Sequence, residues 1–144
     1  NNVKLSTTGY IVEVSSTRKE ILKKAIQRTN DNTVLVLNLA LNYSGRSEIL
    51  DAIRKISVDI CSGVIKPEDL DEGLFSSYLY TKGLPDPDLL IRTSGEMRIS
   101  NFMLWQTSYT ELYVTPVLWP DFSDDDFYQA IWAYQNRQRR FGKI

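Results

Sequence analysis

The fold is decided by one stretch of the sequence, VLVLNLAL at residues 34–41, which runs into the polar segment NYSGR at residues 42–46. The first segment is a continuous run of valine, leucine and alanine with a single asparagine, and turn residues bound it. Such a run predicts a strand that is covered on both faces, as in a parallel sheet. Apolar residues then recur at helical spacing between residues 49 and 60. A strand, a polar loop with glycine and a helix form the α/β unit whose ligands gather beyond the carboxyl ends of the strands.

The remaining apolar patterns predict further elements of the same kind. Strands are expected at residues 9–12, 88–91 and 112–114. Helices are expected at residues 17–29, 75–80 and 102–108. A further short helix is expected to start at residue 67, and a last helix is expected to run from residue 124 to about Arg140. Neither an internal repeat nor a low-complexity linker interrupts the 144 residues. The sequence therefore predicts a single α/β domain, residues 1–144, with a parallel sheet surrounded by helices.

Composition excludes several classes of function. The net charge is −1 and basic and acidic residues are mixed, whereas a nucleic-acid-binding protein would show a basic stripe. The chain contains no histidine, which excludes Ser-His and Cys-His nucleophiles, and its single Cys61 excludes a cysteine zinc site. A bound metal would be a hard cation held by carboxylates and phosphates, in practice Mg²⁺. No apolar run reaches the roughly 18 residues of a transmembrane segment.

Polar residues are densest in the segment RTSGEMRISN at residues 92–101, directly after the predicted strand at residues 88–91. Arg92 is expected at the carboxyl end of that strand, and Gly95 permits a tight turn. Ser100 and Asn101 stand where the cap of the predicted helix at residues 102–108 belongs. Two arginines and a hydroxyl at a helix N-terminus suit a diphosphate anion. An ordinary polar loop with solvated arginines explains the same residues about equally well.

Glu111 precedes the predicted strand at residues 112–114. A carboxylate at this position could bind a metal close to the diphosphate. From the local sequence alone, a capping or strand-edge glutamate is the stronger interpretation.

Longer motifs then point to one family. The sequence contains DLLIRTSGE at residues 88–96, RISNFMLWQ at residues 98–106 and LWPDF at residues 118–122. Together they resemble the carboxyl-terminal signature of the cis-prenyltransferases, which include the undecaprenyl and polyprenyl diphosphate synthases. NLALNYSGR at residues 38–46 resembles the middle motif of this family, and NRQRRFG at residues 136–142 resembles its closing motif. The resemblance covers about residues 33–142.

This resemblance implies a function and a site. The parent enzyme would condense isopentenyl diphosphate with an allylic prenyl diphosphate, giving a longer cis-polyprenyl diphosphate. Arg92, Arg98 and Ser100 would bind the diphosphate of isopentenyl diphosphate, and Glu111 would help to hold Mg²⁺. The resemblance also implies a homodimer, a soluble enzyme of the cytoplasm or a plastid, and peripheral contact with membranes through the lipid product.

One departure from the family separates two interpretations. The amino-terminal motif of the family, an aspartate with a Gly-Asn-Arg-Arg phosphate loop, has no counterpart here, and residues 1–32 resemble the family only loosely. We therefore expect the carboxyl-terminal part of the family domain, without the catalytic aspartate. The chain is then either a fragment of an active enzyme, or a non-catalytic chain that binds isopentenyl diphosphate or a partner. In both cases the strand at residues 34–41 is expected to lack covering segments and to expose apolar surface.

Overall fold

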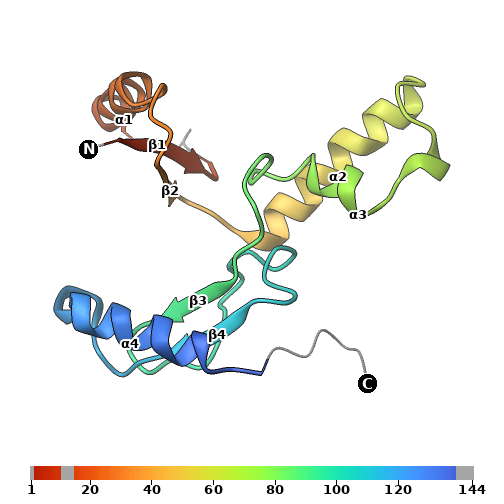
Figure 1. Ribbon diagram of the computed structural model, residues 1–144. Helices are drawn as coiled ribbons and strands as arrows, with labels where there is room; N and C mark the ends of the chain where they lie inside the picture. The colour runs from red at the N-terminus through yellow and green to blue at the C-terminus, as the bar shows by residue number, and fades with distance from the viewer. Residues whose placement is uncertain (1, 11–14, 139–144) are drawn as a thin grey trace. The chain divides into compact units, whose positions relative to one another are not determined.

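A computed structural model describes residues 2–10 and 15–138 of the chain, which forms two compact units, residues 1–84 and residues 85–144. Each unit contains a two-stranded parallel sheet and at least one helix (Figure 1). The predicted fold class, α/β with parallel sheets and surrounding helices, is confirmed. Where the sequence predicted a single domain, the structure divides into these two units.

The first unit is built from two strands and three helices among its described residues. The elements are β1 (Val3–Thr8), α1 (Ser16–Arg28), β2 (Leu35–Ala40), α2 (Gly45–Cys61), a 3₁₀ turn (Pro67–Asp69) and α3 (Glu72–Ser76). Strands β1 and β2 pair in parallel, with Val3 opposite Leu35 and Thr8 opposite Ala40. The side chain of Asn38 accepts hydrogen bonds from the hydroxyls of Ser6 and Thr8, at 2.9 and 3.1 Å.

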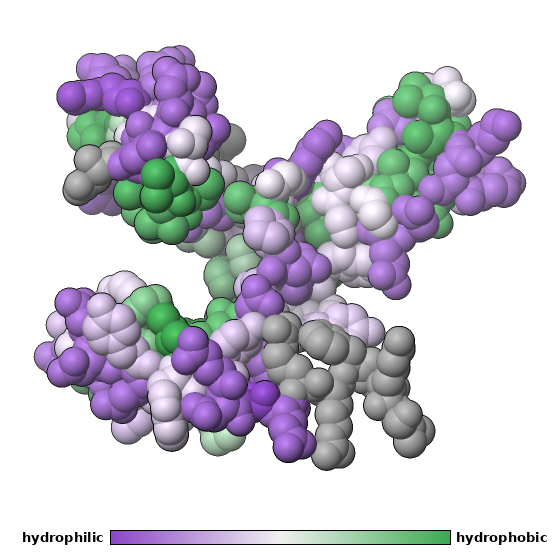
Figure 2. Space-filling view, in the orientation of Figure 1, coloured by the Kyte–Doolittle hydropathy of each residue, from purple (hydrophilic) through white to green (hydrophobic). Residues whose placement is uncertain are grey.

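Strand β2 is not covered on both faces in this structure, and it exposes apolar surface as expected for this chain from its sequence. The first half of the strand and the residue before it are exposed: Val34 by 77%, Leu35 by 57%, Val36 by 46% and Leu37 by 49%. Helix α1 packs against β1, and no third described strand pairs with β2. The unit that contains this sheet accordingly carries an apolar surface patch (Figure 2).

A buried carboxylate organises the rest of the first unit. Glu48 lies in the first turn of α2 and is only 1% exposed. Its Oε1 accepts a hydrogen bond from the backbone N–H of Tyr80 at 2.7 Å, and its Oε2 accepts one from the hydroxyl of Tyr43. Glu48 therefore ties α2 both to the loop that precedes it and to the segment after α3. Ala52 and Ile56 are also buried, one and two turns further along α2.

The second unit repeats the parallel arrangement on a smaller scale. Its elements are β3 (Leu89–Arg92), β4 (Glu111–Val114), a 3₁₀ turn (Trp119–Asp121) and α4 (Asp124–Gln135). Figure 1 shows β3 and β4 side by side, with α4 packed near β4. Ser123 caps α4 as predicted: its hydroxyl accepts from the N–H of Asp126, whose carboxylate accepts from the N–H of Ser123. The helix ends at Gln135, and the predicted end near Arg140 lies outside the described residues.

Three predicted elements are not formed where the sequence placed them. The helix expected at residues 75–80 is instead α3, which ends at Ser76 and is followed by turns. Residues 102–108 form turns rather than a helix. Ser100, Asn101 and Met103 adopt positive φ angles of 46°, 63° and 45°, a conformation that a right-handed helix does not contain. The strand expected at residues 9–12 is instead β1, which ends at Thr8; residues 11–14 lie outside the described part.

Glu48→Ala is expected to destabilise the protein by about 3 kcal/mol, because it leaves the buried N–H of Tyr80 and the hydroxyl of Tyr43 without their acceptor. Glu48→Gln retains one acceptor oxygen and should cost less. Urea denaturation, with the loss of helical signal as the readout, measures the difference. Glu68→Ala, at an exposed position, is the control and should change the free energy of unfolding by less than about 0.5 kcal/mol. Equal effects of Glu48→Ala and Glu68→Ala would contradict the assigned role.

Candidate functional site

The candidate site begins where β3 ends, at Arg92. The ladder between the two strands continues beyond this residue, because Thr115 donates its N–H to the carbonyl of Arg92 at 2.9 Å. The N–H groups of Ser94 and Gly95 then donate to the carbonyls of Val117 and Thr115, both at 2.8 Å. Ser94 and Gly95 have φ angles of 66° and 70°, so the chain turns sharply out of the sheet here. The loop that follows is thereby presented at the carboxyl end of β3.

The loop at residues 96–103 holds several residues in an unfavourable backbone conformation. Ser100 and Asn101 are consecutive left-handed residues, and Met103 is a third. Each such non-glycine residue costs roughly 1 kcal/mol or more, and such strain concentrates at functional sites. Since no helix follows, the predicted cap and the helix dipole do not contribute at Ser100. The turn places its hydroxyl in a strained loop instead.

Glu96 is a residue of this loop that sequence reasoning missed. Its carboxylate forms an ion pair with the guanidinium of Arg98. The Oε2 atom of Glu96 is buried, while the Arg98 side chain is 66% exposed. The pair holds Arg98 at the loop with its guanidinium open to solvent. The sequence does contain a signal for this ion pair, because Glu96 and Arg98 are opposite charges two residues apart in a loop that contains a glycine.

Arg92 and Glu111 do not lie together in this sheet. The register pairs Glu111 with Leu89 and Arg92 with Val114, so the two residues occupy opposite ends of the strand pair, roughly 10 Å apart along the strands. Side chains alternate between the faces of a sheet, and registered partners share a face. Arg92 and Glu111 therefore also belong to opposite faces.

The carboxylate of Glu111 is occupied by Arg137, which follows α4. An Nη atom of Arg137 lies 2.6 Å from an Oε atom of Glu111, and its second Nη donates to the carbonyl of Leu112 at 2.9 Å. Within residues 2–10 and 15–138, no group of three carboxylate, cysteine or histidine side chains could hold a metal ion. In this structure the Glu111 carboxylate is therefore engaged by a guanidinium, and a cation bound there would have to displace Arg137.

The first unit has a separate cluster at the carboxyl ends of β1 and β2. The hydroxyls of Tyr10 and Tyr80 both donate to Asp51, and the two rings meet edge to face at 5.7 Å. The pKa of Asp51 is held below its usual value, chiefly by the hydrogen bond from Tyr10 and then by the bond from Tyr80 and the ion pair with Arg54. These contacts with ionised Asp51 stabilise the folded state. Their contribution is fully present at a pH above the ordinary pKa of an aspartate, and it is lost as the pH falls through the lowered pKa. Burial and the Asp51 hydrogen bond raise the pKa of Tyr80.

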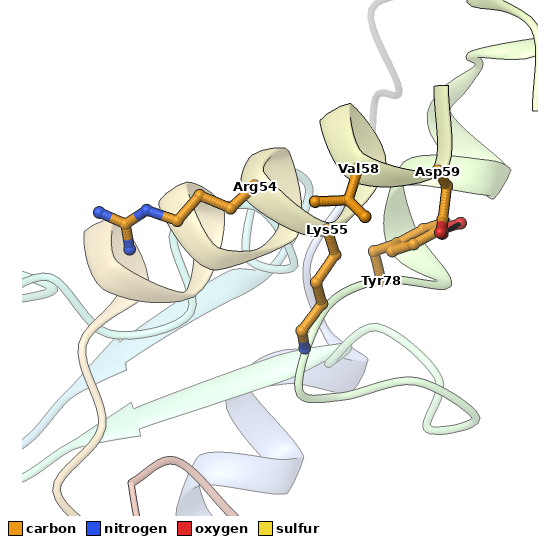
Figure 3. A pocket seen from close by; sticks show the side chains of 5 residues that line it. All are labelled: Arg54, Lys55, Val58, Asp59 and Tyr78. Carbon is orange, nitrogen blue, oxygen red and sulfur yellow. Dashed lines mark hydrogen bonds between the residues drawn. The ribbon is translucent and has the colours of Figure 1, made fainter. Parts of the chain in front are cut away.

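An open hollow of about 380 Å³ lies beside α2 and is lined by Arg54, Lys55, Val58, Asp59 and Tyr78 (Figure 3). The two cations do not converge on it: Arg54 extends along the helix away from Tyr78, and Lys55 leaves the helix in another direction. Arg54 is paired with Asp51 at 2.7 Å, and Asp59 accepts the hydroxyl of Tyr78. The hollow is therefore not arranged to bind an anion. Among the described residues, no helix has the length and hydropathy to cross a membrane.

Comparison with known proteins identifies the family. Residues 1–142 match the prenyltransferase family described as "Putative undecaprenyl diphosphate synthase". The isoprenyl transferase of Geobacillus kaustophilus is 54% identical, over 99% of this chain and 56% of its own length. The tritrans,polycis-undecaprenyl-diphosphate synthase (geranylgeranyl-diphosphate specific) of Picrophilus torridus is 50% identical, over 99% of this chain and 56% of its length.

A solved structure agrees with these matches. The lavandulyl diphosphate synthase of Lavandula x intermedia, crystallised with dimethylallyl diphosphate, has a TM-score of 0.95 and 38% identity, over 98% of this chain and 61% of that one. Parallel sheets flanked by helices define an α/β protein. The chain belongs to the cis-prenyltransferase family of isoprenyl transferases and undecaprenyl diphosphate synthases.

The family match begins at residue 1, whereas the sequence motifs alone supported about residues 33–142. The chain spans a little over half the length of the curated relatives that it matches.

The contact between Glu111 and Arg137 can be measured by a double-mutant cycle. Glu111→Gln, Arg137→Gln and the double variant are unfolded in urea. We expect a coupling energy of about 0.5–1 kcal/mol, since both side chains are partly exposed to solvent. A coupling energy near zero would show that the two residues do not interact in solution. Lys82→Gln, an exposed change of the same charge, provides the control for the loss of a positive charge.

Proposed function

We propose that this chain binds isopentenyl diphosphate at the carboxyl end of β3, as part of an enzyme that condenses it with an allylic prenyl diphosphate. The product is a longer cis-polyprenyl diphosphate. One observation carries the proposal: Arg92 ends a parallel strand, and the strained loop after it presents Arg98 and Ser100. Membership of the cis-prenyltransferase family supports the reaction class.

The chemistry of the loop suits a diphosphate. Arg92 and Arg98 supply two guanidinium groups, which form charge-assisted and bidentate hydrogen bonds with phosphate oxygens. Ser100 adds a hydroxyl. Backbone N–H groups in turns with left-handed residues commonly form concave anion sites, and this loop contains such residues at Ser100 and Asn101. Glu96 keeps Arg98 in place in the absence of an anion.

Mg²⁺ and a homodimer remain parts of the proposal that rest on the resemblance. Glu111 is the proposed metal ligand, together with phosphate oxygens of the substrate. For this to occur, the cation must replace Arg137 at the carboxylate. The homodimer and a peripheral contact with the lipid product are likewise proposed from the family.

Arg98→Ala is expected to weaken the binding of isopentenyl diphosphate about tenfold to a hundredfold, because one charge-assisted hydrogen bond contributes roughly 1.5–3 kcal/mol. Arg92→Ala should have an effect of the same size. Ser100→Ala removes a neutral donor and should cost about 1 kcal/mol. Arg98→Lys should restore binding only in part, since an ammonium group cannot reproduce the planar fork. Isothermal titration of the chain with isopentenyl diphosphate measures each dissociation constant.

Arg54→Ala is the matched control, since Arg54 is exposed and belongs to the first unit. The dissociation constant of the Arg54→Ala variant for isopentenyl diphosphate should equal that of the unchanged protein. Equal weakening by Arg54→Ala and Arg98→Ala would indicate a general charge effect. If Arg98→Ala left binding unchanged, the site assignment would be wrong.

A second function is also proposed for this chain, which spans 56% of the length of the Geobacillus kaustophilus relative. In this alternative the chain binds isopentenyl diphosphate or a partner chain without catalysis. We expect no extended product when the 144-residue chain is incubated with farnesyl diphosphate, labelled isopentenyl diphosphate and Mg²⁺. Thin-layer separation of labelled products is the measurement, with heat-treated protein as the control. Steady formation of polyprenyl diphosphate would reject the alternative.

A further inference from the structure

Helix α1 carries a concentration of positive charge. Its thirteen residues include one acidic side chain, Glu20, and five basic ones: Arg18, Lys19, Lys23, Lys24 and Arg28. The local excess is four positive charges, although the whole chain has a net charge of −1. Figure 2 shows a mainly hydrophilic surface over this helix. The charge of α1 is therefore a local feature and does not follow from the composition of the protein.

The helix presents this charge to solvent in a fixed orientation. Leu22, Ala25 and Ile26 are partly buried on the side that packs against β1. The end of the helix is tied to the sheet, because the hydroxyl of Thr29 accepts the N–H of Leu5 at 3.0 Å. Lys23 lies at the edge of this packed side, one turn before Ile26, and is exposed.

Lys24 and Arg28 lie one turn apart and are also exposed. With Lys23 they define the basic face of α1. In the described part of the chain, the ion pairs involve none of these three residues. Their charge is available to an external partner.

An apolar side chain stands beside this basic face. Ile21 is 62% exposed and lies one turn from both Arg18 and Lys24. A basic helix with an exposed aliphatic residue has the composition of helices that lie at a lipid interface. A nucleic acid or an acidic peptide would use the cations but would offer less for Ile21.

We infer that the basic face of α1 docks the protein on an anionic lipid surface, with Ile21 entering the boundary between headgroups and acyl chains. The inference rests on the proposed function to this extent: an enzyme that makes a polyprenyl diphosphate releases a lipid, and docking places it at the surface that receives the product. The surface potential of an anionic leaflet attracts each nearby lysine or arginine, and salt screens this attraction.

The test is sedimentation of the 144-residue chain with vesicles. Mixed phosphatidylcholine and phosphatidylglycerol vesicles are expected to bind the chain, and pure phosphatidylcholine vesicles are expected to bind it much less. Lys23→Gln with Lys24→Gln should weaken binding to the mixed vesicles about twenty-fivefold, since each basic residue contributes a factor of about five. Glutamine keeps a high helix propensity, and circular dichroism checks that the helical content is unchanged.

Lys66→Gln with Lys82→Gln is the matched control, because it removes two exposed lysines outside α1 and changes the net charge equally. It should leave vesicle binding within about twofold of the unchanged chain. Equal loss in the two double variants would reject a role for α1, as would equal binding to the neutral and the anionic vesicles.

Ile21→Gln separates a lipid surface from other polyanions. It should weaken binding to the mixed vesicles about tenfold, because an aliphatic side chain no longer leaves water. Binding to heparin should remain unchanged in this variant. The inference would be wrong if Ile21→Gln changed neither vesicle binding nor heparin binding, while Lys23→Gln with Lys24→Gln weakened vesicle binding and heparin binding equally. The basic face would then be a general polyanion site. Vesicle binding needs neither turnover nor diphosphate binding, so a failure of the proposed function would leave this result standing.

Discussion

The hydrogen bonds that Ser94 and Gly95 donate to the chain after β4, both at 2.8 Å, are the constraint on which the candidate site depends. They extend the pairing of two short parallel strands beyond Arg92 while forcing the backbone into a left-handed turn. A glycine at residue 95 adopts this conformation without steric cost, and Ser94 adopts it at some cost. The loop that carries Arg98 must then leave the sheet at its carboxyl end. The position of this loop is therefore set by backbone hydrogen bonds, and the ion pair with Glu96 holds the side chain of Arg98 within it.

In the first unit a polar interaction has the corresponding role. Its buried apolar side chains include Ala52, Ile56 and Leu79, which bury little surface. Glu48, by contrast, is buried with both carboxylate oxygens bonded to Tyr43 and Tyr80. Removing a buried carboxylate from water is costly unless its hydrogen bonds are satisfied, so only one packing of the surrounding segments is favourable. The first unit therefore depends more on the hydrogen bonds of Glu48 than on a large hydrophobic interior. The exposed apolar half of β2 agrees with this, because it adds nothing to that interior.

The sequence predicts the elements whose signals are local, and fails where distant bonds decide. Ser123 followed three residues later by Asp126 is a capping pair, and α4 begins where that pattern places it. The segment RISNF predicts a helix start, because Ser100 and Asn101 favour helix caps. The structure instead contains turns there, since Ser100, Asn101 and Met103 adopt positive φ angles, which only asparagine among the three favours. Four of the six residues VKLSTT of β1 are polar, and their pairing with β2 is visible only in the fold. The position of Arg92 at the end of β3 was predictable, because the apolar residues before it predict the strand.

Glu111 shows why a residue can be identified in the sequence while its surroundings are not. Its place at the start of β4 follows from the apolar residues after it, but its partner Arg137 lies 26 residues further along the chain. The guanidinium neutralises the carboxylate and is held in turn by the carbonyl of Leu112 at 2.9 Å. A divalent cation would also neutralise the carboxylate of Glu111, so arginine and metal are alternatives at one carboxylate. Arg92 belongs to the other face and the other end of the strand pair. An anion held by Arg92 and Arg98 and a cation held by Glu111 therefore cannot meet across β3 and β4 alone. A common substrate would have to bring them together around the edge of the sheet.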